Sequence, residues 1–179
     1  MLSTAQEKIP LTKDIVGAGD RWIPDAEYAA IRARVPIVCV DLLPVTRSPV
    51  RKVGLIRRDT YDGGQGWCLV GGAIILDESI GEALARHLRT TLGPRFHFFQ
   101  ETLSLGSVAE YFRDRRPQAL HDPRKHAVAL SHVAECAGVP QPTGEALDFR
   151  WFRVDALPSA REFGFGQDRV VSKLLSSWR

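Results

Sequence analysis

The stretch of sequence that decides the fold, Gly72–Gly93, reads GAIILDESIGEALARHLRTTLG. In its second half Ser79 is followed three residues later by Glu82, which is the pattern of a capping box at the start of a helix. The final glycine of the stretch and the following Pro94 form a standard helix stop. We therefore predict a loop that leads into a capped helix over Ser79–Leu92.

The segment before this stretch is predicted to contain one helix and several strands. Good helix formers after Pro24 favour a short helix, and β-branched runs bounded by turn residues favour strands. The predicted elements are a helix over Asp25–Arg34, strands over Val35–Val45, Val50–Arg58 and Trp67–Val70, and a turn over Asp62–Gly66.

The segment after it is predicted to add further strands and a final helix. The expected elements are strands over Phe96–Leu105, Ser107–Phe112, His126–Cys136 and Phe149–Val154, and a helix over Gln167–Trp178. Strands that surround two or three helices without strict alternation predict an α+β fold, an α/β/α sandwich around a mixed β-sheet. We divide the chain into an N-terminal extension, residues 1–22, and one domain, residues 23–179.

Composition limits the class of protein. Apolar residues make up 44% of the chain, and 24 Lys and Arg against 21 Asp and Glu give a formal net charge of only +3. This balance does not favour a nucleic-acid partner, and no apolar run is long enough to span a membrane. The three cysteines lie far apart inside apolar runs, so we expect buried, reduced thiols. We expect a cytoplasmic protein.

The loop and helix resemble the Nudix box, whose pattern is GX5EX7REUXEEXGU, where U is an aliphatic residue. The positions that agree are Gly72, Glu78, Arg86, Leu88 and Gly93. The resemblance implies a Nudix-like fold in which these box residues have structural roles and Arg86 pairs with Glu78 to brace the loop. It also implies hydrolysis of a nucleoside diphosphate linked to another group.

The predicted helix departs from this pattern at the metal-binding positions. The box expects glutamates where this chain has His87, Thr90 and Thr91. Residues four apart share a helix face, so two glutamates at positions 87 and 91 would converge on one cation. Magnesium and manganese prefer carboxylate ligands, whereas an imidazole and a hydroxyl make a poor magnesium site. Tight metal binding through this helix alone is therefore not expected.

Within the superfamily the chain looks most like the GDP-mannose mannosyl hydrolase group. Asp41 and Arg58 coincide with that group's substrate-side residues, and Glu145 occupies its metal-binding glutamine position. Thr91 and Ala146 stand where the group has its box glutamate and its catalytic histidine. The resemblance implies a homodimer.

A weak Mg²⁺ or Mn²⁺ site remains as an expectation from this resemblance. Glu145 would supply a carboxylate, the Gly72 region a backbone carbonyl and Glu78 a second acid, with help from the diphosphate of the substrate. The missing histidine leaves the general base open, and His87 and His126 are the candidates.

A charged loop, residues 121–126, supplies the other candidate residues. Arg124 and Lys125 are suited to a diphosphate, with His121 beside them as a further ligand-binding residue and His126 available for proton transfer. An exposed polar loop before a strand is the alternative interpretation.

Several other residues are given mainly structural interpretations. His132 is expected to pack inside the protein, Trp67 and Trp151 to pack in the core rather than stack on a base, and only Arg58 of the Arg57–Arg58 pair to face the site. The Phe163–Asp168 turn is interpreted as a lid or as a helix cap through Asp168.

Two kinds of function are consistent with these residues. The first is a Nudix-type hydrolase of a nucleoside diphosphate linked to a sugar or a similar group, with Arg58, Arg124 and Lys125 on the diphosphate. The second is a catalytically silent module that binds a nucleotide or phosphorylated metabolite. A metal-independent, non-hydrolytic enzyme on the same fold is a third possibility.

Overall fold

The computed structural model describes residues 23–178, so the predicted extension over residues 1–22 lies outside the described part. It contains the elements α1 (Asp25–Arg32), β1 (Ile37–Thr46), β2 (Lys52–Asp59), β3 (Gln65–Cys68), β4 (Val70–Ala73), α2 (Ile80–Leu92), β5 (Phe96–Phe98), η1 (Gln100–Thr102), β6 (Ser104–Phe112), β7 (Leu120–His121), β8 (Ala127–Gly138), β9 (Asp148–Arg153), η2 (Ala160–Glu162) and α3 (Asp168–Ser177).

The strands form one mixed sheet with the order β3-β2-β1-β8-β6-β7, in which β4 also pairs with β1, β5 with β8 and β9 with β2. At its centre β1 and β8 run parallel along the whole of β1, from Ile37 opposite Ala127 to Thr46 opposite Cys136. Strand β1 is buried over most of its length, as expected for a β-branched central strand. The α+β fold and the mixed sheet are therefore confirmed.

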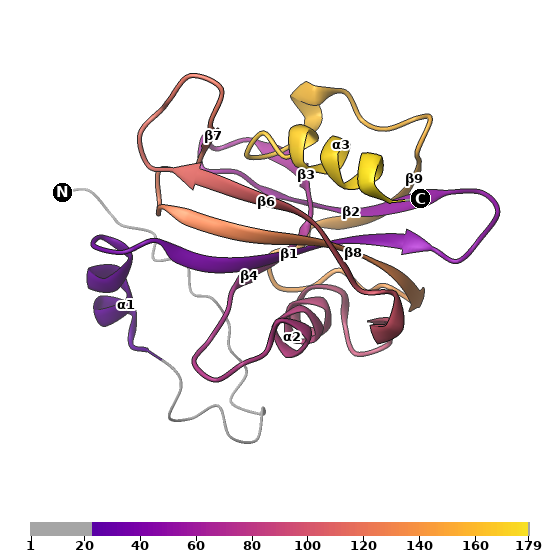
Figure 1. Cartoon of the computed structure of the whole chain (residues 1–179), viewed down its shortest axis with the longest axis horizontal. Coiled ribbons are helices and arrows are strands. Elements are labelled where there is room, and N and C mark those ends of the chain that lie inside the picture. The colour runs from indigo at the N-terminus through magenta and orange to yellow at the C-terminus, as the bar shows by residue number, and fades with distance from the viewer. Residues whose placement is uncertain (1–22, 179) are drawn as a thin grey trace.

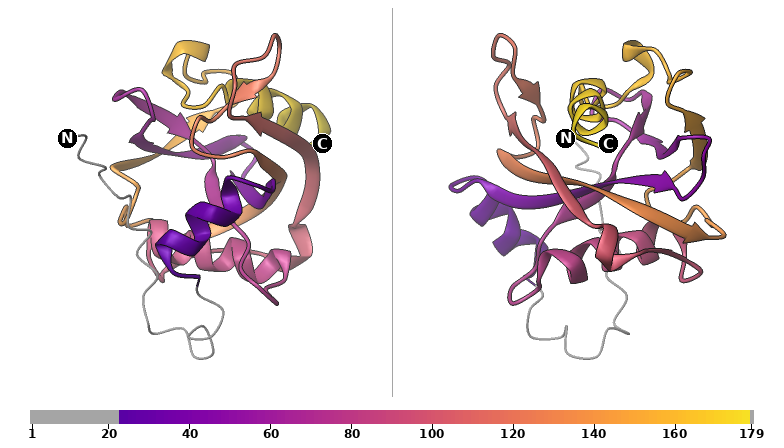
Figure 2. Two further views of the ribbon diagram at one scale, coloured as in Figure 1. Left: turned by 90° about the vertical axis from the view of Figure 1, so that its left-hand side faces the viewer. Right: turned by 45° about the vertical axis from the view of Figure 1, so that its right-hand side comes forward.

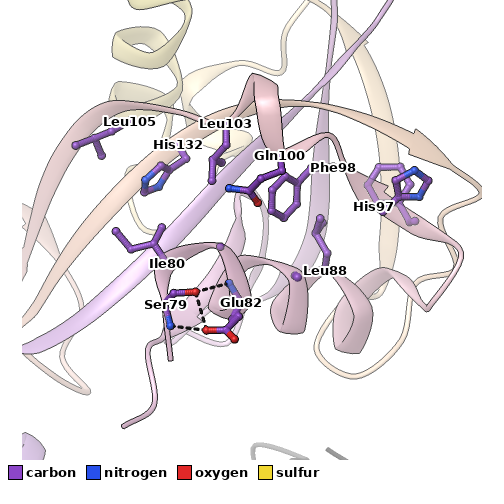
Figure 3. A pocket seen from close by; sticks show the side chains of 13 residues that line it. Ser79, Ile80, Glu82, Leu88, His97, Phe98, Gln100, Leu103, Leu105 and His132 are labelled. Carbon is purple, nitrogen blue, oxygen red and sulfur yellow. Dashed lines mark hydrogen bonds between the residues drawn. The ribbon is translucent and has the colours of Figure 1, made fainter. Parts of the chain in front are cut away.

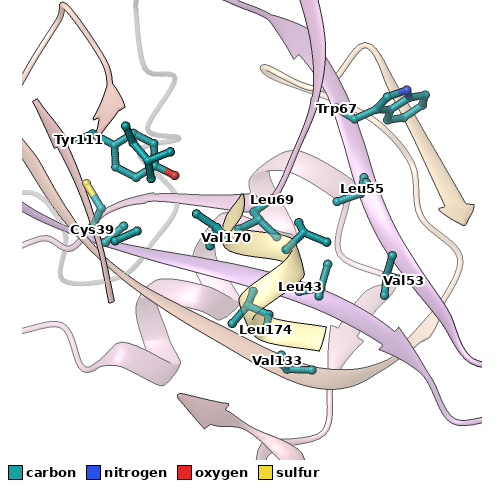
Figure 4. Packing of buried hydrophobic residues seen from close by; sticks show 14 of the residues in the cluster. Cys39, Leu43, Val53, Leu55, Trp67, Leu69, Tyr111, Val133, Val170 and Leu174 are labelled. Atoms are coloured by element: carbon teal, nitrogen blue, oxygen red, sulfur yellow. The ribbon is translucent and has the colours of Figure 1, made fainter. Parts of the chain in front are cut away.

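Two helices cover opposite faces of the sheet (Figure 1). Helix α3 places Val170, Val171 and Leu174 against one face, where they join a core that includes Leu43 and Leu55 (Figure 4). Helix α2 packs its apolar side against the other face, together with a second core cluster: Val40, Leu42, Ile56, Val70, Ala83, Leu84, Leu88, Leu92 and Phe96. The views in Figure 2 show the same layers from two further directions. The sheet between two helical layers is the predicted α/β/α sandwich.

The boundaries of the elements differ from the predictions in the region after α2. The continuous strand predicted over Phe96–Leu105 is wrong, because β5 ends at Phe98 and the turn η1 separates it from β6. The hydroxyl of Thr102 explains the break: it donates to the carbonyl of Phe99 and accepts from the amide of Glu135. A side chain that binds backbone groups in this way competes with the strand ladder.

A short strand was also missed. Residues 120–121 form the short strand β7 beside β6, inside what the sequence indicated as a polar loop.

Within residues 23–178 no helix is both long and apolar enough to cross a lipid bilayer. The three cysteines are free and buried, as predicted.

Candidate active site

The loop before α2 is fixed by a buried ion pair. Arg86 donates from Nε to Oε1 of Glu78 at 2.7 Å and from Nη2 to Oε2 at 2.8 Å, and its Nη2 also donates to the carbonyl of Ala73 at 2.9 Å. The amide of Ile75 donates to the same carboxylate. Burial opposes ionisation of Glu78, but these hydrogen bonds outweigh it and hold its pKa below the usual value. The pairing expected between Arg86 and Glu78 is present.

His87 is half-buried against the glycine at the start of the box. Its Nε2 donates to the carbonyl of Ala73 at 3.1 Å, an assignment that follows from the carbonyl being an acceptor. A Cβ atom added to Gly72 would come within 2.6 Å of the imidazole Cε1, so only glycine leaves room for this ring. Burial, followed by the neighbouring charge of Arg86, lowers the pKa of His87 to about 4. The ring is therefore neutral near pH 7.

The two threonines of α2 offer no charge to the site. Thr90 donates its hydroxyl to the carbonyl of Arg86 at 3.0 Å, and Thr91 is buried. Gly93 ends the helix as predicted, with its amide bonded to the carbonyl of Arg89 and φ at 80°. The helix thus keeps the backbone geometry of the box but presents no carboxylate at positions 87, 90 or 91.

Asp41 lies on β1 next to this loop. It is opposite Gly71 in the β1–β4 pairing, one position from Val40 opposite Gly72, so Asp41 and His87 contact consecutive glycines from opposite faces of the sheet. A Cβ atom added to Gly71 would come within 2.5 Å of the Asp41 carboxylate. Asp41 is only 8% exposed. Burial raises its pKa to about 7, with Lys125 and Arg58 opposing this shift and Glu145 adding to it.

Arg58 and Glu145 form an ion pair beside Asp41. The guanidinium Nη1 lies 2.5 Å from the Glu145 carboxylate, and the Arg58 side chain is 14% exposed. Its neighbour Arg57 is exposed, with its guanidinium 5.8 Å from the centre of the Trp67 ring. The two arginines therefore face opposite sides of β2, as predicted, and Arg58 is the one whose charge acts on Asp41.

The charged loop between β7 and β8 is only partly directed toward these residues. Arg124 donates to both oxygens of the buried Asp122, at 2.9 and 3.0 Å. The charge of Lys125 acts on both Asp41 and His87. The ring of His126 instead stacks on Phe112, with ring centroids 4.9 Å apart.

Two aromatic residues that the sequence analysis missed complete the arrangement. Two guanidinium groups lie over the Phe165 ring, that of Arg58 at 5.6 Å and that of Arg124 at 5.0 Å from the ring centroid. Tyr61 lies 5.7 Å from Phe165 and 5.2 Å from His121. We call Arg58, Tyr61, His121, Arg124 and Phe165 the aromatic–arginine cluster.

The turn that carries Phe165 has an unusual backbone. Phe165 has φ at 56°, a value that non-glycine residues seldom adopt and that often marks functional positions. Gly164 packs so closely that an added Cβ would lie 2.7 Å from the sulfur of Cys68. The helix cap predicted through Asp168 is wrong, because Gln167 is the N-cap and its side chain instead bonds Leu69 and Tyr111. The glycines on both sides of Phe165 were the available sequence signal.

The residues expected to hold a divalent metal do not fit that task. Both oxygens of Glu78 are bound by Arg86, and the Glu145 carboxylate is paired with Arg58. In the described part of the chain no group of three His, Cys, Asp or Glu side chains converges on one point. The Gly72 region leaves only backbone carbonyls, which without carboxylates make a weak magnesium site.

A cavity of about 810 Å³ lies elsewhere, between the start of α2 and the β5–β6 segment (Figure 3). Ile80, Gln100, Leu103 and Leu105 lie around it, and His132, only 4% exposed, forms part of its wall. His132 is packed as predicted, with Nδ1 bonded to the carbonyl of Leu130. None of the predicted site residues lines this cavity.

The chain resembles several solved structures. A possible asymmetric diadenosine tetraphosphate hydrolase from Jonesia denitrificans is 28% identical, with a TM-score of 0.70 over 80% of this chain and 95% of that one. The Nudix domain of Shewanella oneidensis NrtR, complexed with ADP ribose, is 18% identical, with a TM-score of 0.53 over 86% and 98%. A bifunctional NMN adenylyltransferase/ADP ribose pyrophosphatase from Francisella tularensis, complexed with AMP and a Mn ion, is 18% identical, with a TM-score of 0.58 over 84% and 46%.

No curated protein matches the chain. A family model described as "Domain of unknown function (DUF4916)" matches residues 18–178, which is almost the whole chain. The α2 box and the sandwich seen here agree with the Nudix structures that the chain resembles. The chain therefore belongs to the DUF4916 family and has the fold of the Nudix superfamily.

Proposed function

We propose that the chain is a Nudix-type hydrolase of a nucleoside diphosphate that is linked to a sugar or a similar group. The observation that carries this proposal is the buried Asp41 carboxylate, which lies against Gly71 beside the Nudix loop and is acted on by the charges of Arg58 and Glu145. A carboxylate with a raised pKa and arginine charge thus lie beside the Nudix loop, while His87 contacts Gly72 from the opposite face of the sheet.

The ligand would be held by cations and aromatic rings. Arg58, Arg124 and Lys125 supply positive charge for a diphosphate, since guanidinium groups match phosphate oxygens and an ammonium acts as a point charge. Tyr61 and Phe165 supply flat apolar surface for a base or a sugar. Two of the structures that the chain resembles are complexes with AMP or ADP ribose, which is the same class of ligand.

Asp41 is the proposed proton acceptor. With its pKa raised to about 7 it can take a proton from an attacking water near neutral pH. The water oxygen would then form a bond to one phosphorus, the bridging P–O bond would break, and the departing phosphate would keep the electron pair. The products are two monophosphates, and the proton on Asp41 returns to solvent. Neither His87, which is neutral and bonded to Ala73, nor His126, which stacks on Phe112, is needed as the base.

A silent binding module is the second candidate, and one observation favours it. The acids left in and near the box, Glu78 and Glu145, are both paired with arginines. A site in which these charges are compensated can still bind a phosphorylated ligand through Lys125 and Arg124 without turning it over.

Cytoplasmic location and a homodimer remain expectations from the sequence.

A panel of ADP-ribose, diadenosine tetraphosphate and GDP-mannose tests the proposal, with product release and ligand binding measured in parallel. We expect hydrolysis of at least one compound, loss of turnover in Asp41→Asn, and binding weakened about tenfold or more in Arg58→Met. Arg57→Met is the matched control and should behave like the native protein, because Arg57 faces away. Binding without product by the native protein would select the silent module, and no binding at all would exclude both.

A further inference from the structure

The turn that carries Phe165 is fixed at both ends by hydrogen bonds. At its start the amide of Gly164 donates to the carbonyl of Trp67 on β3 at 3.0 Å. At its end the side chain of Gln167, only 8% exposed, accepts from the backbone amide of the residue before β4 at 2.8 Å and donates to the hydroxyl of Tyr111 on β6 at 3.2 Å. The sheet therefore determines where the Phe165 ring lies.

The backbone of Phe165 adopts a conformation that costs free energy. Its φ of 56° is in the left-handed region, which glycine reaches without steric cost and which an aromatic residue seldom adopts. The residues on both sides are glycines, yet position 165 has a large side chain. Strained residues of this kind cluster at sites where a side chain has to be aimed. The contacts of the ring indicate what the strain serves.

Two arginines from distant parts of the chain meet at this ring. Arg58 is on β2 and Arg124 is in the β7–β8 loop, and their guanidinium groups lie 5.6 and 5.0 Å from the ring centroid. Both distances are within the range of cation–π attraction. The two guanidinium groups cannot be farther apart than the sum of these distances. One aromatic ring thus limits the separation of two like charges.

We propose that Phe165 is a positioning residue that holds Arg58 and Arg124 together as one clamp on the phosphate groups of the ligand. This inference rests on the proposed function. Two like charges at one ring repel each other, and an anion that bonds to both offsets this repulsion. A guanidinium fork matches two phosphate oxygens, so two forks at a limited separation can bind neighbouring phosphates of a diphosphate.

The clamp is restrained before a ligand arrives. Arg58 is paired with Glu145 and Arg124 with Asp122, and the two arginine side chains are 14% and 30% exposed. A long side chain that is already held by a carboxylate and a ring loses less conformational entropy when it binds a ligand. Partial burial also strengthens its contact with a phosphate oxygen. Besides offering the ligand an apolar surface, the Phe165 ring therefore sets the positions of the two charges.

Calorimetric titration with inorganic pyrophosphate, which has phosphate groups but no base or sugar, tests this inference, with ADP-ribose titrated in parallel. Phe165→Leu should bind pyrophosphate about tenfold more weakly, because leucine keeps most of the volume but has no π face. Phe165→Tyr keeps the π face and should bind within about threefold of the native protein. Phe163→Leu, in the same turn but packed on the core beneath α3, is the matched control and should bind normally.

A double-mutant cycle separates positioning from a purely structural role. Arg124→Met should weaken pyrophosphate binding about tenfold in the native protein but threefold or less in Phe165→Leu, because without the ring the two guanidinium groups no longer act together. Losses that simply add would mean that Phe165 affects only stability, which urea denaturation of each variant measures, and would overturn the inference.

The outcomes for the inference and for the proposed function are distinct. Native-like pyrophosphate binding by a folded Phe165→Leu would overturn the role of Phe165 and leave the proposed function intact. Binding of ADP-ribose but not of pyrophosphate by the native protein would do the same, since the phosphate groups would then not be what the clamp holds. Failure of the native protein to bind either probe, with or without Mg²⁺, would exclude the inference and the proposed function together.

Discussion

Arg86 and Glu78 form a pair whose side chains are only 6% and 7% exposed. The spacing of the box predicts this pair, since a structural acid and the arginine that braces it occur at fixed offsets in the sequence. For Phe165 the flanking glycines indicate only a turn, because the position of its ring depends on contacts far along the chain. An added Cβ on Gly66 would lie 2.3 Å from the amide nitrogen of Gly164, and this close approach fixes the turn that carries Phe165.

Replacing Arg86 tests the structural role of the pair. Arg86→Met should lower the free energy of unfolding by about 3 kcal/mol, because it leaves the Glu78 carboxylate buried without its partner. Urea denaturation measures the change. Arg150→Met is the control, since Arg150 pairs with Asp148 at an exposed position and should cost less than about 1 kcal/mol. Equal losses in the two variants would contradict the structural role of Arg86.

Asp41 should make the stability of the protein depend on pH. Its pKa in the folded state, about 7, is above the value of 3.8 for a free side chain, so the folded state binds the proton more tightly. Stability contributed by the protonated form is therefore lost as the pH rises from about 4 to about 7. Asp41→Asn should gain on the order of 4 kcal/mol relative to the native protein between pH 4 and pH 8.

Chemical denaturation at these two pH values measures the gain. His87 acts with the opposite sign: its folded pKa of about 4 is below the usual 6.5, so stability is lost as the pH falls from about 6.5 toward 4. His87→Gln is therefore the control: its free energy of unfolding should differ in pH dependence from that of the native protein only below about pH 6.5. A difference between Asp41→Asn and the native protein that is constant over pH would show that the Asp41 pKa is not raised.

Helix α2 begins with the capping box that the sequence predicts. Ser79 accepts from the amide of Glu82, and the Glu82 carboxylate accepts from the amide of Ser79 at 2.8 Å. Local chemistry of this kind can be predicted from a few neighbouring residues. The break between β5 and β6 could not, because it depends on the contact of Thr102 with Glu135 on β8. Short-range signals thus predict where elements start, and long-range contacts decide where strands are interrupted.

Ser79→Ala should destabilise the protein by about 1 kcal/mol, since it removes the oxygen that satisfies the amide of Glu82. Thermal unfolding should show a midpoint lower by roughly 2–4 °C for a chain of this size. Ser159→Ala is the matched control: Ser159 forms the same box at the single turn η2, and its loss should cost less. A larger effect at Ser159 would mean that the cap of α2 does not limit stability.

In the whole molecule the sheet brings together residues that are far apart in the chain. The sequence predicts the α/β/α layers, because these follow from hydrophobic patterns and from the resemblance to a known box, and it offers Asp41, Arg58, Lys125 and Glu145 as candidate site residues. It could not predict that Arg58 and Arg124 would both contact the Phe165 ring, since this depends on the packing of β2, the β7–β8 loop and the turn before α3. It also gave no sign of the cavity between α2 and β6.

The central claim is that a nucleoside diphosphate derivative binds beside the Nudix loop rather than in this cavity. Amide NMR of the 19.9 kDa chain during titration with ADP-ribose tests it directly. We predict that the largest shift changes occur at Gly71, Gly72, Lys125 and Phe165. Changes confined to Gly81, Gln100 and Leu105, which line the cavity, would contradict the claim.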